Sequence, residues 1–247
     1  MEKFKMWLKK DWKETKLLFR ALPALPFAVL VVALICMNIL AGKTIVNESW
    51  IALDAGILVS WMSFLAGDML VKRFGPKASI KVSLAAIACN LLGSLIFNIG
   101  AAIPGAWGDA PNPAIDSTLS GTLHALAAGT AAFIVAIIVD CFLNWAILKR
   151  FKKRTSFRAY AVASYVSTMV GQFVDNFVFA MLFLFALGYI TFLGAVMMAA
   201  VGAVVELLCQ IVLSPVGYKI AEGWRKRGVG EEYVACVEEA QEVNKEG

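Results

Sequence analysis

The sequence predicts an all-α membrane protein that folds as a bundle of six transmembrane helices. Its 247 residues are 60% hydrophobic and 17% charged, whereas soluble domains are about 45–50% apolar and about 25% charged. The apolar residues form six blocks, each long enough for the ~20 residues that cross a bilayer as a helix. Basic residues fill alternate segments between the blocks, while the other segments contain Lys43 as their one basic residue. This alternation places both termini in the cytoplasm.

Proline and glycine separate the six expected spans, because proline lacks an N–H donor and both residues favour turns. The spans cover residues 22–41, 52–71, 80–103, 122–148, 164–187 and 190–213, and Pro215 closes the last one. Three regions result: a basic interfacial helix at 1–21, the transmembrane domain at 22–220, and a cytoplasmic polar tail at 221–247.

The segments outside the spans fit this arrangement. Residues 1–21 interleave Lys with Trp and Phe, a pattern typical of a helix that lies on lipid headgroups. The outer loop at 104–121, rich in Pro, Gly and Asp, is either a lid over a pocket, with Trp107 as its gate, or a plain connector. Gly188 and Tyr189 form the tight turn before the last span, and the tail is expected to form a short exposed helix.

The composition argues against several functions. The five cysteines show no CxxC spacing and the chain has one histidine, so we expect no disulfide framework, metal site or cofactor. The net charge of +5 does not indicate a nucleic-acid partner, because the basic residues lie between the spans. No Walker A motif is present, so the chain does not hydrolyse ATP. An intramembrane enzyme is a remote alternative, since Ser167 and His124 are expected at different depths.

One stripe of the fifth span organises the chain. At 100° per residue, the residues Ser164, Thr168, Gln172, Asp175 and Phe179 share one narrow face. A carboxylate near the middle of a bilayer costs roughly 2.5–3.5 kcal/mol, and it normally faces the interior of the bundle. We therefore expect Gln172 and Asp175 to contact a ligand.

The other spans also carry polar residues at helical spacing, together with aromatic residues or glycine on the same faces. They are Asn38 in the first span, Trp61, Phe64, Asp68 and Lys72 in the second, Asn90, Ser94 and Asn98 in the third, Asp140 and Asn144 in the fourth, and Gly202, Glu206 and Gln210 in the sixth. Interhelical hydrogen bonds, worth about 0.6 kcal/mol each, are an alternative explanation for the amides and serines. Asp68 and Lys72 are spaced for an i, i+4 ion pair.

The acidic residues are harder to explain by packing. Uncompensated insertion of Asp140, Asp175 and Glu206 would cost roughly 8–10 kcal/mol in total. They indicate a hydrated or ligand-filled cavity, which suits a carrier or a substrate-binding permease subunit better than an enzyme.

Several of these residues resemble the pattern of the VUT or queuosine-precursor transporter family of six-span bacterial membrane proteins. The most distinctive piece is the set Ser167, Thr168, Gln172, Asp175 and Phe179 in the fifth span. Four other pieces follow in the family's order: Asn38 to Lys43 with Gly42 in place of Asn, Asp68 with Phe74 and Gly75, Asp140, and Ser214 with Pro215. The resemblance covers about residues 25–220.

The resemblance implies import of 7-deazapurine precursors of queuosine across a prokaryotic inner membrane. It also implies a fold similar to the substrate-binding S components of energy-coupling-factor vitamin transporters. In that reading Gln172, Asn90 or Asn144 pairs with the deazaguanine edge, and Asp175 accepts from its N–H groups or a cationic aminomethyl arm. Trp61, Phe64 or Phe179 stacks on the ring, and Asp68 and Asp140 complete the site.

Two positions depart from the family pattern with opposite changes of charge. The usual Glu of the second span is Lys72, and the usual Lys of the sixth span is Glu206. We interpret them as an ion pair of inverted polarity or as a sign that the substrate differs.

Two transport mechanisms remain open. A stand-alone carrier, for which a homodimer is one option, would use alternating access with proton coupling through Asp140, Asp175 or Glu206. A vitamin-transporter S component would instead need a coupling module with two ATPases, with a small-residue surface on the first span for docking.

Overall fold

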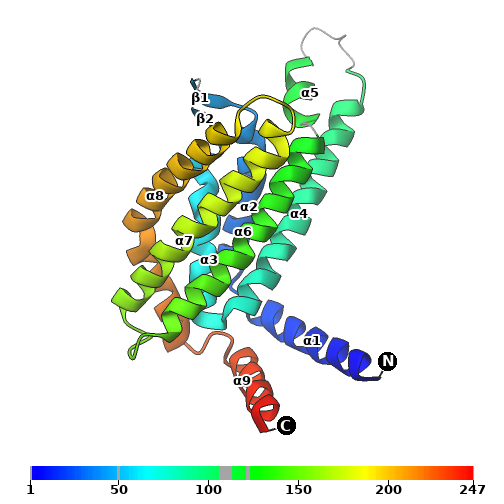
Figure 1. The fold of residues 1–247 in the computed structure, drawn as a ribbon. Helices are drawn as coiled ribbons and strands as arrows, with labels where there is room; N and C mark the ends of the chain where they lie inside the picture. The colour runs from blue at the N-terminus through cyan, green and yellow to red at the C-terminus, as the bar shows by residue number, and fades with distance from the viewer. Residues whose placement is uncertain (1, 49–50, 106–112, 121–122, 247) are drawn as a thin grey trace.

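Long helices running side by side form the body of the protein, and a short β-hairpin lies at one end of them (Figure 1). This computed structural model describes residues 2–48, 51–105, 113–120 and 123–246. The elements are, in chain order, α1 (Glu2–Ala21), α2 (Ala24–Ala41), β1 (Thr44–Glu48), β2 (Ile51–Asp54), α3 (Ile57–Phe74), α4 (Pro76–Ala102), α5 (Pro113–Ser120), α6 (Leu123–Lys149), α7 (Phe157–Phe179), the π-helix η1 (Ala180–Phe185), α8 (Phe192–Lys226) and α9 (Glu231–Glu246).

Five helical segments of the described residues are long and apolar enough to cross a membrane. They contain α2, α4, α6, α7 with η1, and α8. These segments make the chain an all-α, multi-pass membrane protein, as the composition predicts. The helix α3 is 18 residues long, as α2 is, but Asp68, Lys72 and Arg73 lower its mean hydropathy. Ten of its residues are buried, and it contacts α2, α4, α6, α7 and α8, so it lies inside the bundle.

The hairpin replaces the expected start of the second span at residue 52. β1 and β2 pair antiparallel, with Val46 opposite Leu53. The Asp54 carboxylate then accepts a hydrogen bond from the Gly56 N–H at 2.7 Å, a local turn that side chains of Asp commonly make. This turn ends the strand, and the helix therefore begins only at Ile57.

The helix α8 continues through Pro215, which we expected to end the last span, and reaches Lys226. A proline inside a helix leaves the carbonyl four residues earlier without its partner. Here the Ser214 hydroxyl donates to that carbonyl, Ile211 O, at 3.1 Å. The side-chain bond replaces the missing backbone bond, so the helix is not interrupted.

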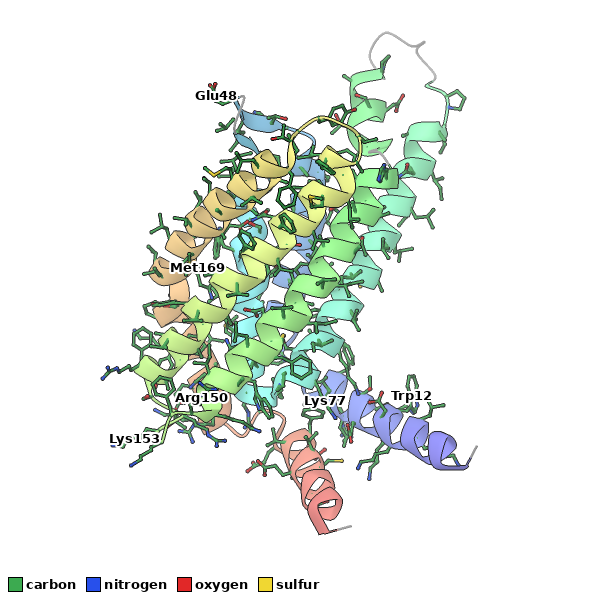
Figure 2. The ribbon with its side chains drawn as sticks, in the orientation of Figure 1. Trp12, Glu48, Lys77, Arg150, Lys153 and Met169 are labelled. Carbon is green, nitrogen blue, oxygen red and sulfur yellow. The ribbon has the colours of Figure 1, made fainter. Side chains whose placement is uncertain are left out.

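The two terminal helices pack on one end of the bundle, opposite the hairpin and α5 (Figure 1). We expected the tail to form an exposed helix, but α9 is partly buried. Tyr233 is 2% exposed and lies edge-on to Phe74, with ring centroids 6.2 Å apart. On α1, Asp11 forms an ion pair with Lys81 of α4 at 2.7 Å. Figure 2 shows Lys77, Arg150 and Lys153 at this end and Glu48 at the other. The basic segments therefore gather at one end of the molecule.

Candidate functional site

A cavity of about 160 Å³ lies between the helices near the hairpin end. Its polar lining consists of three carboxylates, from Asp54, Asp175 and Glu206, the four amides of Asn38, Asn90, Asn98 and Asn176, and the hydroxyls of Ser60, Ser94 and Thr118. Its apolar lining includes Phe97 and Phe179. No Lys, Arg or His is among the described residues that line it. The cavity is therefore acidic and rich in hydrogen-bonding groups.

Glu206 is held where α3, α7 and α8 meet. Its carboxylate accepts hydrogen bonds from the Ser60 hydroxyl and from Asn176 Nδ2, the latter at 3.4 Å. Gly202, one turn earlier on α8, makes this approach possible, because a Cβ there would stand 2.7 Å from Asn176 Nδ2. The close contact of α7 with α8 thus places Asn176 against Glu206.

The other two carboxylates have fewer partners. Asp54 accepts the Gly56 N–H bond, and burial raises its pKa to about 6. Asp175 is half-buried and lines the cavity without a hydrogen bond to any described residue. The charges of Asp54, Asp175 and Glu206 lie close enough to repel one another. A positively charged ligand would relieve this repulsion.

The opposite side of the cavity carries amides from α2 and α4. Asn38 Nδ2 donates to Asn90 Oδ1 at 2.9 Å, and Asn98 Nδ2 donates to the Ser94 carbonyl at 2.8 Å. Each amide group can make further hydrogen bonds, because its second polar atom has none within the described residues. These side chains could read the polar edge of a ligand while Phe179 contacts its apolar face.

A second polar cluster lies deeper, toward the basic end. Asp68 accepts hydrogen bonds from Asn144 Nδ2 at 2.5 Å, from Gln210 Nε2 at 2.6 Å and from the Ser164 hydroxyl. All four side chains are at most 2% exposed. Asp68 and Asn144 therefore join α3 to α6, α7 and α8 and do not line the cavity.

Asp140 and Gln172 are buried as well, and both are 0% exposed. No polar atom of either side chain has a hydrogen-bond partner among the described residues. Gln172 lies one helical turn below Asn176, so it borders the cavity region without lining it. Neither residue contacts the cavity in this conformation, and their roles toward a ligand stay predictions.

The two aromatic residues of α3 that we expected at the ligand lie elsewhere. Phe64 is fully buried and packs edge-on against Phe133, with ring centroids 6.2 Å apart. The Trp61 indole donates to the Leu58 carbonyl of its own helix at 2.8 Å. Of the three proposed stacking residues, Phe179 alone lines the cavity.

The interpretation of Lys72 and Glu206 as an ion pair is wrong. Glu206 binds Ser60, and Lys72 is twelve residues further along α3, which corresponds to about 18 Å at 1.5 Å per residue. Lys72 Nζ instead donates to the Arg154 carbonyl at 3.4 Å and lies 4.9 Å from the centroid of the Tyr218 ring. The i, i+4 pair of Asp68 with Lys72 is absent too, since Asp68 turns toward Asn144 and Gln210.

Three residues that line the cavity, Asp54, Asn176 and Ser60, were not identified from the sequence. Asp54 was assigned to the body of a span, although an acidic residue followed by Ala-Gly is itself a turn signal. Asn176 directly follows Asp175, and Ser60 lies eight residues before Asp68 on one helical face. Periodicity extended toward the outer ends of α3 and α7 would have found both.

Other expectations concern the outer loop and the catalytic alternative. Trp107 lies outside the described residues, but Thr118 and Leu119 of α5 line the cavity, so part of the 104–121 loop does border it.

His124 Nε2 is 2.9 Å from the Leu182 carbonyl, and the Ser167 hydroxyl donates to the Ser164 carbonyl at 3.2 Å. These two side chains therefore do not form a nucleophile and base pair.

Comparison with known proteins identifies one family. The family model described as "Putative vitamin uptake transporter" matches residues 54–220. This range contains all three carboxylates of the cavity and the whole buried cluster. No curated protein matches the chain, and no solved structure matches it.

The two buried aspartates should respond differently to loss of charge. Asp68→Asn removes a charged acceptor and turns an amide N–H₂ toward existing donors, and hydrogen bonds to charged groups contribute about 1.5–3 kcal/mol each. We expect a clearly lower Tm for this variant in detergent. Asp140→Asn breaks no hydrogen bond, so its Tm should be unchanged or higher. Equal losses of Tm in both variants would contradict this difference.

Proposed function

The chain belongs to the vitamin uptake transporter family, and we propose that it imports a small cationic or donor-rich solute through the acidic cavity. The substrate class that we propose is a 7-deazapurine precursor of queuosine. The observation that carries this proposal is the lining: three carboxylates and four amides face the same space, and no cationic side chain of the described residues accompanies them.

The chemistry of the lining suits a deazaguanine that carries an aminomethyl arm. The ammonium of the arm would pair with Asp175, which has no hydrogen-bond partner of its own among the described residues. The ring N–H and amino groups would donate to Glu206 or Asp54, and Asn90 would bind the ring carbonyl. The Phe179 ring would lie against the flat face of the base.

The size of the cavity favours a small solute. At about 160 Å³ it is smaller than the ~300–1,000 Å³ of pockets for drug-sized ligands. A single fused ring system with a short arm is thus a better candidate than a dinucleotide or a long-chain vitamin.

Membrane orientation is part of the proposal. We take α3 as the sixth span, because it runs within the bundle beside the five apolar segments. The end that carries Lys77, Arg150 and Lys153 then faces the cytoplasm of a prokaryotic cell, together with both termini. The hairpin, α5 and the cavity face outward in this arrangement.

A vitamin-transporter S component is the second candidate function. The family description names vitamin uptake, and an S component would bind a vitamin in such a cavity and depend on a coupling module for transport. Uptake by liposomes that contain only this chain would exclude that dependence.

Substrate binding should depend on the unpaired carboxylate. We expect Asp175→Asn to weaken binding of 7-aminomethyl-7-deazaguanine by about 10- to 100-fold, because one charge-assisted hydrogen bond is worth about 1.5–3 kcal/mol. Isothermal titration of the purified protein measures the change. Glu239→Gln, on the exposed face of α9, is the control and should bind like the wild type. If the wild-type protein does not bind this compound, the proposed substrate is wrong, and a thermal-shift screen of purines and vitamins follows.

Binding of the cation should also become stronger as the pH rises through about 6. Burial raises the pKa of Asp54 in the folded protein from its ordinary value of 3.8 to about 6, so Asp54 is neutral below that pH and negative above it. A negative Asp54 attracts the ligand cation, and the affinity therefore increases with pH. Titrations at several pH values should show this rise in the wild type and a flatter profile in Asp54→Asn. A steeper profile in the variant would contradict the assignment.

The orientation can be tested with single cysteines. In a variant whose five native cysteines are replaced by alanine, Glu48→Cys should react with a membrane-impermeant maleimide on intact cells. Lys153→Cys should react only after the membrane is permeabilised. The opposite labelling pattern would invert the proposed topology.

A further inference from the structure

A line of buried and half-buried polar side chains connects the cavity with the deeper cluster. On α7 these residues recur every fourth position, at Ser164, Thr168, Gln172 and Asn176, and so share one face of the helix. Asn176 contacts Glu206 at the cavity, while Ser164 contacts Asp68 in the cluster. The line therefore has one end in each site.

Three helices contribute a side chain to both sites. α3 contributes Ser60 to the cavity and Asp68 to the cluster, and α8 contributes Glu206 and Gln210 in the same way. Each of the helices α3, α7 and α8 thus extends from the cavity to the cluster without a break. A shift of any of these helices on ligand binding would change the hydrogen bonds of the cluster as well.

Asp140 lies beside the cluster, and no hydrogen bond from the described residues stabilises its carboxylate. It is 0% exposed, and neither of its oxygens has a hydrogen-bond partner within the part of the chain that the structure describes. The nearby Ser167 hydroxyl donates to the Ser164 carbonyl instead. An isolated buried carboxylate is too costly to remain charged, so Asp140 requires a proton or a bound cation.

The surroundings of Asp140 offer no positive charge. The titratable groups that face it are Asp68 from α3, Tyr160 from α7 and Cys141 from its own helix. From α4 the Ser79 hydroxyl lies in the same region, since a Cβ at Gly67 would stand 3.6 Å from it and 3.9 Å from Asp140 Oδ2, but it donates to the Gly67 carbonyl at 3.2 Å. No Lys, Arg or His of the described residues interacts with Asp140. Its neutralising partner must therefore come from solution.

The packing around Asp140 favours a proton over a metal ion. A Cβ added at Gly171 would stand 2.9 Å from the Asp140 Cβ and 2.7 Å from Phe64 Cε1, so the side chain lies in a tightly filled space. A hydrated cation does not fit there, whereas a proton needs no volume. Three donors face Asp68, and two neighbouring carboxylates share a proton when both cannot be ionised.

We propose that Asp140, paired with Asp68, binds the proton that this transporter carries together with its substrate. This inference rests on the proposed transport function and assigns its energy source. α3, α7 and α8 link the proton site to the cavity, so substrate binding and proton binding change each other's affinity by the same factor. An inward proton gradient then drives uptake without an ATPase.

The proton itself can be detected without any substrate. Infrared spectra of the purified protein in lipid nanodiscs at neutral pH should contain the carbonyl stretch of a protonated carboxylic acid. The difference between wild type and Asp140→Asn should isolate that band, and Glu239→Gln should retain it. A spectrum in which Asp140→Asn removes only the signal of an ionised carboxylate would overturn the proposal.

The coupling is measured in liposomes that contain the purified protein alone, with radiolabelled 7-aminomethyl-7-deazaguanine as the probe. A gradient of one pH unit, acid outside, should give accumulation of up to about tenfold at one proton per substrate. Asp140→Asn should lose this accumulation but keep exchange of labelled for unlabelled substrate, which needs no net proton movement. Preserved exchange also shows that the variant is folded, as does its Tm.

Each other outcome has a distinct meaning. Accumulation driven by a sodium gradient and not by a proton gradient overturns the proton assignment, as does a gradient response that survives Asp140→Asn. If the probe does not bind to the wild type, the proposed substrate fails. The infrared band still decides whether Asp140 holds a proton, and the solute found by thermal shift then replaces the probe.

Discussion

The structure depends on one constraint: polar groups inside a membrane bundle must find their partners within the protein. α3 concentrates this requirement, because Ser60 and Asp68 project from it into a space that lipid cannot reach. α7 and α8 supply the matching groups, with Ser164 and Gln210 toward Asp68 and Glu206 toward Ser60. This explains why α3, which carries Asp68, Lys72 and Arg73, lies inside, surrounded by helices that are apolar enough to face lipid.

Glycines determine how closely these polar groups can meet. A Cβ at Gly171, Gly202 or Gly217 would stand within 3 Å of side chains on neighbouring helices, so each is a point where two helices approach more closely than larger residues allow. The missing side chain of Gly202 leaves room for Asn176 to contact Glu206. The missing side chain of Gly171 leaves room for Phe64 and Asp140 to pack against α7. Small residues commonly serve close packing in membranes. Here they also set the distances that define the cavity and the acid pair.

Sequence periodicity predicts most of the helices and the faces on which their polar residues lie, because both follow from helix geometry and hydropathy. It fails where one side chain replaces a backbone partner. Asp54 ends a strand by binding Gly56, and Ser214 allows α8 to pass Pro215. Sequence periodicity also predicts the face of the helix on which a residue lies, but it does not predict how deep in the bundle that residue lies. Gln172 and Asp175 share a stripe, yet Asp175 lines the cavity and Gln172 lies below it, since depth depends on how neighbouring helices are staggered.

An acidic cavity must release a cation as well as bind it. In the empty site the mutual repulsion of Asp54, Asp175 and Glu206 raises the free energy of the unliganded state, and a bound cation removes that repulsion. The same attraction opposes release on the far side of the membrane. Protonation of the carboxylates would weaken it, and with a pKa of about 6 Asp54 gains a proton under mildly acidic conditions. Asp140 is a separate proton-binding group: in the proposed symport its proton enters with the substrate and leaves with it, so it does not act by neutralising the cavity carboxylates.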